Sequence, residues 1–522
     1  MSERKIRSLF DKSKRSLKSA VFSRFGLILL LLLLQFLLMF SLFRWFATFV
    51  PHLFGSSMVF NLLMVVILLN SNADPSAKLT WLIVIMVMPV FGALLYLYTQ
   101  SDIGHRALKK RIANIVQETR FDLQQQPQAM QRLQKENGGA AALANYVGHC
   151  GCHPVWQNTK VTYFPSGEAK LKALLKALEN AEQFIFLEYF IVDEGVMWGQ
   201  VLDILAEKAQ NGVDVRVMID GTCEFTTLPH DYPDRLKTLG IQCKLFAPAR
   251  PFVSTHYNYR DHRKIAVIDG IISFTGGVNL ADEYINQVER FGHWKDTAIM
   301  LEGAATNSFT LMFLQMWGVD GSPMEITGFV RQQMPRIPDA AGYVLPYSDC
   351  PLDGNQVGER VYMDILYRAE RYVHIMTPYL ILDSTMETAL KYAAERGVDV
   401  HLILPGIPDK KYAWWLAHTH YPALIAAGVK ISEYTPGFVH AKVFVADDRE
   451  AVVGTINLDY RSLYHHFECA AYLYGVPCIA DIEHDFQDTL TRCSRITERR
   501  LQSIPFSQKL AGAALKALAP LM

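Results

Sequence analysis

One motif occurs twice in this chain, with the same residue types in the same order and at the same spacings. Each copy has a histidine, a lysine two positions later, an aspartate, and a glycine three positions before an asparagine. Agreement at five positions in two places indicates a duplication rather than chance. The two copies are His262-Arg-Lys264 with Asp269 and Gly276-Gly-Val-Asn279, and His440-Ala-Lys442 with Asp447 and Gly454-Thr-Ile-Asn457.

The local pattern predicts a strand, a turn and a second strand in each copy. Apolar runs end at Asp269-Gly270 and at Asp447-Asp448, and another apolar run follows each turn. Side chains two positions apart on a strand share a face, so the histidine and the lysine of each copy point the same way. A glycine shortly before the asparagine lets the backbone pass close to a ligand. Each copy therefore offers an imidazole, an ammonium and an amide on one surface.

Two such surfaces brought together suit an anionic phosphodiester. The lysines neutralise charge and the amides hold oxygens, while one histidine attacks phosphorus and the other protonates the leaving alcohol. The aspartate of each copy completes the motif, although its place at a turn also fits a purely structural role. The candidate catalytic residues are His262, Lys264, Asp269, His440, Lys442 and Asp447.

The duplication extends well beyond the motif. In each half an apolar run precedes a helical stretch and then a second apolar run, which begins with Gly-Val-Asp-Val at Gly212 and at Gly397. Strand, helix and strand in this order indicate a βαβ unit built around a sheet. We therefore predict an α/β fold of two pseudo-twofold-related halves between about residues 160 and 500. The active site should lie at their interface, because neither half alone holds both histidines.

These motifs resemble those of the phospholipase D superfamily, and further residues resemble its bacterial cardiolipin synthases. The resemblance runs from about residue 60 to the C-terminus. It implies a duplicated phospholipase D-like sandwich, each half having a central mixed sheet flanked by helices, preceded by transmembrane helices. The segments that carry it are Asn72-Ala-Asp-Pro-Ser-Ala-Lys78, Asn258-Tyr-Arg-Asp-His262, Gly276-Gly-Val-Asn-Leu-Ala-Asp-Glu-Tyr284, Trp294-Lys-Asp296, Gly454-Thr-Ile-Asn-Leu-Asp-Tyr-Arg-Ser462 and Phe467-Glu468.

The resemblance implies transfer of a phosphatidyl group from one phosphatidylglycerol to another through a phosphatidyl-histidine, with no metal or other cofactor. Anionic membrane lipid would be the partner and nucleic acid would not. By analogy, Asp296 should orient His262 and Glu468 should orient His440. Many superfamily members carry serine where this chain has Gly277, whereas Thr455 keeps a hydroxyl in the second copy. The candidate substrate-binding residues are Asn279, Asn457, Gly277 and Thr455.

Other activities are compatible with parts of this pattern. A hydrolytic phospholipase differs only in whether water or a lipid alcohol attacks second. A nuclease of the superfamily shares both motifs, but the zero net charge argues against nucleic-acid binding. A cardiolipin synthase of the CDP-dependent kind needs Asp-x-x-Asp-Gly, which this chain lacks. The close spacing of His149-Cys-Gly-Cys-His153 does not suit one metal ion. The sequence leaves the oligomeric state open.

Three apolar runs near the N-terminus predict membrane-spanning helices. The candidate spans are residues 25–43, 53–69 and 79–98. Residues 1–24 carry an excess of lysine and arginine, which places this end in the cytoplasm by the positive-inside rule. Residues 106–111 after the third run are also basic, so charge favours an even number of spans and hydropathy favours three. We expect a multi-pass protein of the bacterial cell membrane whose catalytic part lies on the cytoplasmic face.

These observations give a predicted organisation of seven segments, the last of which suits either membrane contact or docking. They are a basic N-terminus (1–24), a transmembrane region (25–98), a juxtamembrane connector (99–155), a first half (156–320), a linker (321–355), a second half (356–500) and an amphipathic C-terminal segment (501–522).

Overall fold

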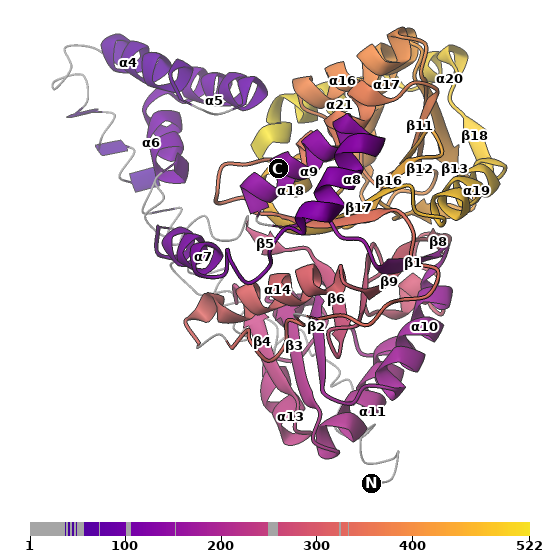
Figure 1. Ribbon diagram of the computed structural model, residues 1–522. Helices are drawn as coiled ribbons and strands as arrows, with labels where there is room; N and C mark the ends of the chain where they lie inside the picture. Colours follow the sequence, from indigo (N-terminus) through magenta and orange to yellow (C-terminus); the bar gives the residue numbers. More distant parts are fainter. Residues whose placement is uncertain are drawn as a thin grey trace. The chain divides into compact units, whose positions relative to one another are not determined.

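A computed structural model of the chain describes most of residues 57–521 (Figure 1). The exceptions are residues 72–73, 101–105, 152, 249–258, 323–324 and 332, while only a few residues between 37 and 49 are described. The predicted basic N-terminus and most of the first predicted span, 25–43, lie outside the described residues. Contacts divide the chain into a smaller unit, which contains the N-terminal helices, and a larger unit, which contains both halves of the duplication.

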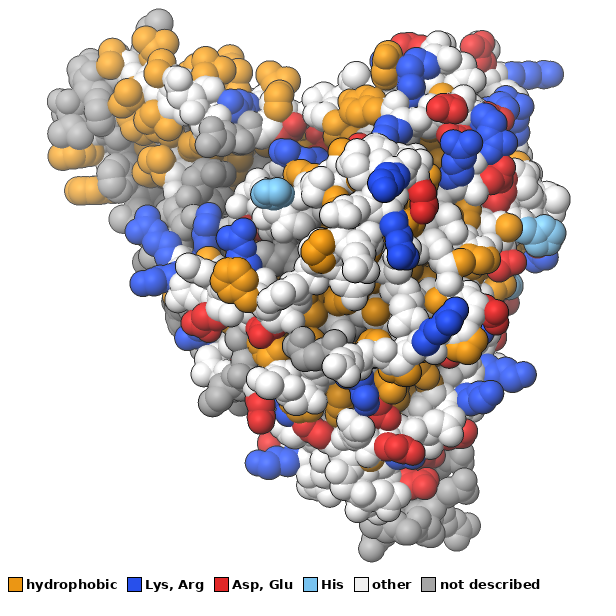
Figure 2. All heavy atoms as spheres, viewed as in Figure 1, with side chains coloured by type: hydrophobic (Ala, Val, Ile, Leu, Met, Phe, Trp, Pro, Cys, Tyr) orange, Lys and Arg blue, Asp and Glu red, His pale blue; other side chains and the backbone are white. Residues whose placement is uncertain are grey.

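The smaller unit contains three short apolar helices that pack on one another. They are α4 (Ser57–Leu69), α5 (Pro75–Val87) and α6 (Pro89–Gln100). Their shared core includes Met64, Leu68, Ile85 and Ala93. Many other apolar side chains on these helices, such as Met86, are exposed, and Figure 2 shows them as a hydrophobic surface over this unit.

The predicted span 79–98 is not one helix, because the chain breaks at Met88. This residue has φ −132° and ψ 74°, outside the helical region, and Pro89 follows it. A proline disfavours helical geometry in the residue before it, so α5 ends there and α6 begins in a new direction. The two helices approach closely at Gly92, where a Cβ would lie 2.6 Å from the Val84 carbonyl oxygen. Within the described residues, no single helix combines the length and the apolar character needed to cross a bilayer.

The first half of the larger unit is built on a seven-stranded mixed sheet of order β1-β9-β7-β6-β2-β3-β4. Strands β2 and β3 are parallel and joined by α11, whereas β6 is antiparallel to β2. The strands are β1 (Thr159–Phe164), β2 (Phe184–Tyr189), β3 (Asp214–Asp220), β4 (Gln242–Phe246), β6 (Lys264–Ile268), β7 (Ile272–Gly276) and β9 (Ala298–Gly303). The principal helices are α10 (Gly167–Glu179), α11 (Val196–Gln210), α13 (Tyr232–Thr238) and α14 (Thr306–Trp317).

The second half repeats this plan in a nine-stranded sheet, to which the first half contributes one short strand, β5 (Arg260–Asp261). Strands β11 and β12 are parallel and joined by α16, and β15 is antiparallel to β11. The predicted duplication of an α/β unit is therefore confirmed. The main strands are β10 (Tyr343–Asp349), β11 (Tyr372–Met376), β12 (Asp399–Pro405), β13 (Lys430–Tyr434), β15 (Val443–Ala446), β16 (Glu450–Gly454), β17 (His466–Tyr474) and β18 (Cys493–Arg495). The principal helices are α15 (Val357–Arg368), α16 (Ser384–Glu395), α17 (Lys411–Ala426) and α19 (Ile479–Leu490).

Two segments predicted as connections contribute to the second half. The predicted linker 321–355 contains β10, which pairs antiparallel with β17 along its whole length. The predicted connector 99–155 contains α8 (Pro127–Glu136) and α9 (Gly138–Gly151), whose Leu133 and Val147 lie in the core of the second half. Both segments were predicted to be polar or turn-rich connections, yet one adds a strand to the second sheet and the other buries an apolar face in the core of that half.

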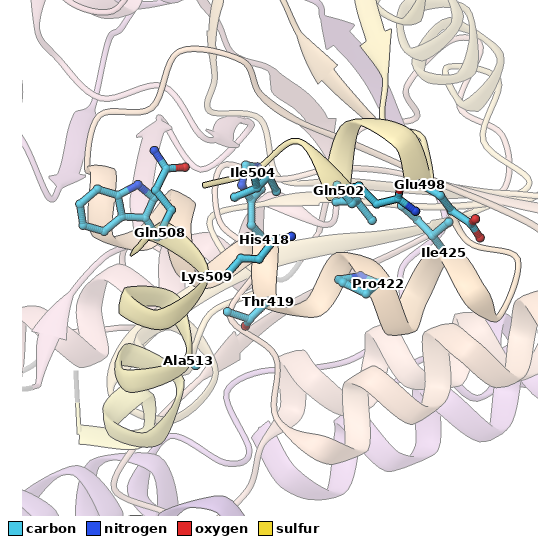
Figure 3. Close-up of a pocket in the computed structure, with 12 residues that line it drawn as sticks. His418, Thr419, Pro422, Ile425, Glu498, Gln502, Ile504, Gln508, Lys509 and Ala513 are labelled. Atoms are coloured by element: carbon cyan, nitrogen blue, oxygen red, sulfur yellow. The ribbon is translucent and has the colours of Figure 1, made fainter. Parts of the chain in front are cut away.

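The C-terminal segment docks on the second half. Helix α21 (Phe506–Leu518) packs on α17 at Gly512, where a Cβ would lie only 2.7 Å from the Trp415 carbonyl oxygen. Beside this contact a groove of about 520 Å³ separates α17 from α20 (Glu498–Gln502) and α21. Figure 3 shows Lys509 and other α21 residues at its edge. This contact fits the predicted docking role for residues 506–513, and the predicted membrane contact stays a prediction.

Candidate active site

A short strand that crosses from the first half to the second positions His262. Strand β5 (Arg260–Asp261) pairs parallel with β17 of the opposite half. The pairing continues one residue further, because the His262 amide donates a hydrogen bond to the Phe467 carbonyl at 2.9 Å. His262 therefore lies beside Glu468, and its Nδ1 lies 2.9 Å and 3.0 Å from the two carboxylate oxygens of Glu468.

The mirror arrangement positions His440. Strand β14 (Gly437–Val439) pairs parallel with β8 (His293–Lys295) of the first half. The His440 amide donates to the Lys295 carbonyl at 2.7 Å. This register places His440 beside Asp296, whose carboxylate lies 2.7 Å from Nδ1 of His440.

The predicted partnership of acids and histidines is therefore wrong in its pairing. Asp296 was assigned to His262 and Glu468 to His440, by analogy with the superfamily. The crossing strands exchange them, so each acid orients the histidine of the other half. Both carboxylates and both imidazoles are buried. Four side chains from two halves thus form one composite arrangement.

The environment favours neutral imidazoles with the proton on Nδ1. Burial lowers the pKa of His440 to about 4 and that of His262 well below its ordinary value, although the neighbouring carboxylates oppose this. Burial alone would raise the pKa of Glu468, but His262 and His466 outweigh it and hold that pKa well below its usual range. Each carboxylate accepts a hydrogen bond from Nδ1–H, which leaves the lone pair on Nε2. Nε2 is the atom available to attack phosphorus or to carry a proton.

Both motif lysines are buried beside the histidines. The ammonium group of Lys264 donates to the carbonyl oxygen of His262 at 2.5 Å, and that of Lys442 donates to the carbonyl oxygen of His440. Burial lowers the pKa of Lys264 to about 8 and that of Lys442 to about 7. The charge on Lys264 also contributes to the lowered pKa of His440 and of Lys442, so lysines from both halves act on the same region.

The two motif asparagines are buried and bond within the protein. Asn279 accepts a hydrogen bond from the Ile191 amide at 3.0 Å and donates to the Tyr284 hydroxyl at 2.7 Å. The ring of Tyr284 packs against His440, with centroids 5.4 Å apart. Asn457 donates to Asp459 at 3.1 Å, and its Oδ1 has no hydrogen-bond partner among the described residues. The two amides are therefore not equivalent.

Asp269 and Asp447 lie away from the histidines, which corrects their assignment as catalytic residues. Each aspartate stands five residues after its motif lysine, at the far end of the strand. The two backbone positions are therefore about 16 Å apart. Each adopts positive φ, 51° and 54°, and its carboxylate accepts three backbone amide hydrogen bonds. The donors are residues 182–184 for Asp269 and residues 370–372 for Asp447. Their physical role is to cap the start of β2 and of β11.

Gly277 and Thr455 touch the orienting acids. The Thr455 hydroxyl donates to Glu468, so it is an internal bond rather than a vacant phosphate ligand. A Cβ on Gly277 would lie 2.0 Å from Oδ1 of Asp296 and 2.8 Å from the His440 carbonyl oxygen. Glycine is therefore required here for space. The predicted role of this pair in phosphate contact is replaced by a role in placing the two acids.

Aromatic side chains and a third histidine complete the surroundings, although the sequence had assigned none of them a role in the site. Phe190 packs on His262 with ring centroids 5.0 Å apart, and Trp294 packs on His440 at 5.4 Å. His466 packs on His262 at 5.3 Å. The signal that could have found Trp294 and His466 is their shared position, two residues before Asp296 and Glu468.

One group in the described part of the chain has the donor types of a metal site. One ligand atom each of His262, His466 and Glu468 lie within 4.8 Å of one another. Glu468 already accepts hydrogen bonds from His262 and Thr455. A metal ion there would replace the bond that orients His262, so this donor set is better matched to holding protons.

Comparison with protein families finds two matches in the chain. Residues 174–317 and 362–490 match a model described as "Cardiolipin synthase, PLD-like domain". Residues 59–99 match the model of the phospholipase D-nuclease N-terminal region, which covers α5 and most of α4 and α6.

Similar proteins extend over most of the chain. An uncharacterized protein of Streptococcus mutans serotype c is 56% identical, covering 88% of this chain and 99% of its own length. A cardiolipin synthase of Alkalihalophilus pseudofirmus is 32% identical, covering 89% of this chain and 93% of its own length. The crystal structure of phosphatidylserine synthase from Haemophilus influenzae Rd KW20 superposes with a TM-score of 0.56 at 16% identity, covering 73% of this chain and 98% of that one. The last similarity concerns the fold.

Proposed function

Since this chain belongs to the cardiolipin synthase family of phospholipase D-like phosphatidyltransferases, we propose that it makes cardiolipin from two molecules of phosphatidylglycerol. The observation that carries the proposal is the crossed arrangement in which each half orients the histidine of the other. Double displacement at phosphorus needs one group that attacks and a second that carries a proton. Two histidines held by two buried carboxylates supply both.

The first step forms a covalent intermediate. The Nε2 lone pair of His262 attacks the phosphorus of one phosphatidylglycerol, and the bond from phosphorus to the glycerol oxygen breaks. His440 enters this step as an imidazolium, because the negative charge of the bound phosphate favours its protonated form. The glycerol oxygen takes the Nε2 proton of this imidazolium, so glycerol leaves as a neutral alcohol. The Nδ1–H group of His262 keeps its hydrogen bond to Glu468. The carboxylate stabilises the positive charge that develops on the imidazole ring. The products are phosphatidyl-His262, glycerol and neutral His440.

The second step transfers the phosphatidyl group to lipid. The free hydroxyl of another phosphatidylglycerol attacks phosphorus and gives its proton to Nε2 of His440. The phosphorus–nitrogen bond breaks, and its electron pair returns to His262. Cardiolipin leaves, and both histidines regain their starting protonation. No proton, electron or co-reactant is left unaccounted for.

The lysines provide the electrostatic part of this mechanism. Two buried ammonium groups beside the histidines attract the phosphate and stabilise the negative charge of the transition state, in a setting where water screens little. Asn279 uses both Oδ1 and Nδ2 in hydrogen bonds within the protein and Asn457 uses Nδ2, so each amide keeps at most one N–H for a phosphate oxygen. We therefore assign charge neutralisation to Lys264 and Lys442 and a mainly positioning role to Asn279.

We further place the protein in the bacterial cell membrane, multi-pass, with the catalytic halves on the cytoplasmic face. The excess of lysine and arginine in residues 1–24 and the basic residues at 106–111 support this orientation, because the positive-inside rule puts both ends of the membrane region on the cytoplasmic side. Exposed apolar side chains on α4 to α6 support attachment to lipid, which would also concentrate the substrate.

The deciding experiment is incubation of the purified full-length protein with phosphatidylglycerol alone, followed by separation of the lipids. Cardiolipin and glycerol in equal amounts support transfer. Phosphatidic acid would show instead that water attacks in the second step, and cleavage of single-stranded DNA without lipid turnover would favour a nuclease. A His262→Ala and a His440→Ala variant serve as controls for contaminating activity.

A further inference from the structure

The two motif asparagines differ in what their side-chain oxygens bond. In the first half, Oδ1 of Asn279 accepts a hydrogen bond from the Ile191 amide at 3.0 Å. The matching residues of the second half are Asn457 and Tyr379, but Oδ1 of Asn457 is buried and has no hydrogen-bond partner among the described residues. Nδ2 of Asn457 donates to Asp459, which fixes the orientation of the amide, because an ionised carboxylate only accepts. The open atom is therefore an acceptor.

A second open acceptor lies beside Tyr379. The Tyr379 hydroxyl donates to Oδ2 of Asp409 at 2.6 Å, whereas Oδ1 of that carboxylate is buried and bonds to no described residue. Burial raises the pKa of Tyr379 well above its usual range, and the charges of Asp409 and of Asp459, the partner of Asn457, add to this effect. The two acceptors therefore belong to one region. Leaving buried polar groups unpaired destabilises a protein, so this region calls for a ligand that donates hydrogen bonds.

This region lies next to the side chains that surround His440. Phe438 packs on His440 with ring centroids 5.9 Å apart, and Tyr379 packs on Phe438 at 6.4 Å. Tyr284 packs on the His440 ring at 5.4 Å. Burial raises the pKa of Tyr284, and the charge of Asp409 contributes to the rise. Asp409 is therefore within electrostatic reach of a ring that touches His440.

Open acceptor oxygens suit an alcohol and not a phosphate. A phosphodiester oxygen also accepts hydrogen bonds, and the charge of a carboxylate repels it. A hydroxyl group can donate to both open oxygens. In the reaction proposed above, the departing glycerol takes a proton from His440 and the incoming glycerol hydroxyl returns one there, so both occupy the same place beside His440. Each of these glycerol groups carries at least one further hydroxyl that does not react.

We propose that Asp409, held by Tyr379, is a specificity-determining residue that selects glycerol as the alcohol of the transfer reaction, with Oδ1 of Asn457 as the second acceptor. The proposal rests on the function proposed above. The open oxygens accept hydrogen bonds from the hydroxyls that do not react, while the reacting oxygen faces Nε2 of His440. An alcohol without the extra hydroxyls leaves these oxygens buried and unpaired, so the phosphatidyl-enzyme transfers to it less often.

The first half offers a matched control. Strands β3 and β12 each lead into a glycine whose amide bonds to the last residue of the neighbouring strand. Three residues after that glycine stands Glu224 in the first half and Asp409 in the second. The carboxylate of Glu224 bonds to His230, and it lies in the half that carries His262. Glu224→Gln therefore changes the equivalent acid without changing the region beside His440.

The test measures how the phosphatidyl-enzyme divides between two alcohols. The purified full-length protein receives phosphatidylglycerol together with deuterated glycerol and n-propanol at equal concentrations, and mass spectrometry gives the ratio of the two new phospholipids. Because both products come from one intermediate, their ratio does not depend on the amount of active enzyme or on the rate of the first step. Ethanolamine as a third alcohol shows whether the carboxylate selects a cation instead.

We expect the wild type to favour glycerol over n-propanol and Asp409→Asn to lower that ratio by about tenfold. The single carbonyl oxygen of the asparagine is taken by the Tyr379 hydroxyl, so an N–H group faces the alcohol in place of an acceptor. Tyr379→Phe should lower the ratio by about threefold, because Asp409 loses the bond that holds it. Glu224→Gln should leave the ratio within about twofold of the wild type.

Four outcomes would overturn the proposal: an unchanged ratio in Asp409→Asn, an equal fall in Glu224→Gln, a wild-type preference for ethanolamine over glycerol, or incorporation of neither alcohol. A wild type that prefers glycerol but accumulates phosphatidic acid in place of cardiolipin contradicts only the proposed function. If Asp409→Asn does not fold, Tyr379→Phe decides by the same criterion.

Discussion

Glu468 bonds to His262 although the two residues come from different halves of the chain, with Nδ1 2.9 Å from the carboxylate. The backbone enforces this relationship, because the strand before His262 pairs in register with the strand that carries Glu468. A cardiolipin synthase of this kind cannot therefore divide its site into two independent halves. Damage to either half should affect the histidine of the other.

An activated leaving group separates the roles of the two histidines. With phosphatidyl-p-nitrophenol, the departing nitrophenolate needs no proton, so the first step depends on the nucleophile alone. We expect His440→Ala and Asp296→Asn to give a burst of nitrophenolate close to one per active enzyme, followed by slow turnover. His262→Ala should give none, and Glu468→Gln a burst slowed by about 10²-fold or more.

The same variants assayed on phosphatidylglycerol should all lose about 10³-fold or more in kcat, because glycerol is a poor leaving group without an acid. Stopped-flow absorbance measures the burst, and circular dichroism confirms that each variant is folded. A burst in His262→Ala but not in His440→Ala would assign the nucleophile to His440. A burst sensitive to Asp296 rather than to Glu468 would contradict the crossed pairing.

The turn aspartates should affect stability more than catalysis. Asp269→Asn and Asp447→Asn each weaken three backbone hydrogen bonds at a site remote from the histidines. We expect each to lower the free energy of unfolding by about 1–3 kcal/mol, with kcat at 20 °C within about threefold of the wild type. Thermal unfolding and steady-state rates on the same preparations give both numbers. A loss of kcat as large as that of His440→Ala, in a folded protein, would restore these residues to the catalytic set.

The sequence predicted the elements of this site better than their assembly. The spacing of His262 and Lys264, and of His440 and Lys442, follows from strand periodicity, and the repeated Gly-Val-Asp-Val segments predicted the βαβ units that are observed. The exchange of Asp296 and Glu468 could not be read locally, because it depends on which strands pair across the halves. Asp269 and Asp447 were predicted to be catalytic because they occur in both copies of the motif. A duplication repeats residues that cap a strand as well as residues that do chemistry.

The break at Met88, in contrast, could have been predicted from the local sequence. Hydropathy favoured a continuous helix over residues 79–98, but a local rule was available, since Pro89 disfavours helical geometry in the residue before it. The predicted linker and connector failed for a different reason. Their polar composition conceals β10 and the apolar faces of α8 and α9, which become meaningful only against the second sheet.

The buried lysines should make substrate binding weaken as pH rises. Burial lowers the pKa of Lys442 to about 7 and of Lys264 to about 8, so both lose their charge as pH rises from 7 to 9. We expect KM for phosphatidylglycerol in mixed micelles to rise over this range, by up to about tenfold per pH unit. Lys442→Met should raise KM at pH 7 and flatten the rise. A KM that is constant from pH 7 to 9 would show that the lysines stay charged.

The same lysines should make the free energy of unfolding depend on pH. Their pKa values in the folded protein lie below the ordinary value of 10.5, so between about pH 7 and 10.5 the unfolded chain binds more protons than the folded one. Stability contributed by this pair should therefore rise with pH across that window. The measurement is the difference in free energy of unfolding between Lys442→Met and the wild type at pH 7 and at pH 9. The variant's advantage should shrink at the higher pH.

Gly277 provides the sharpest steric test of the crossed arrangement. Its backbone conformation is not one that favours glycine, yet a Cβ there would lie 2.0 Å from the carboxylate of Asp296. We expect Gly277→Ser to displace Asp296 from His440 and to reduce kcat on phosphatidylglycerol about as far as Asp296→Asn does. Because the defect lies in proton transfer, the nitrophenolate burst should survive.

Thr455→Ser serves as the matched control. It keeps the hydroxyl that bonds to Glu468, so it should retain kcat within about threefold of the wild type. Wild-type turnover in Gly277→Ser would mean that Asp296 reaches His440 from a position that leaves room for a side chain.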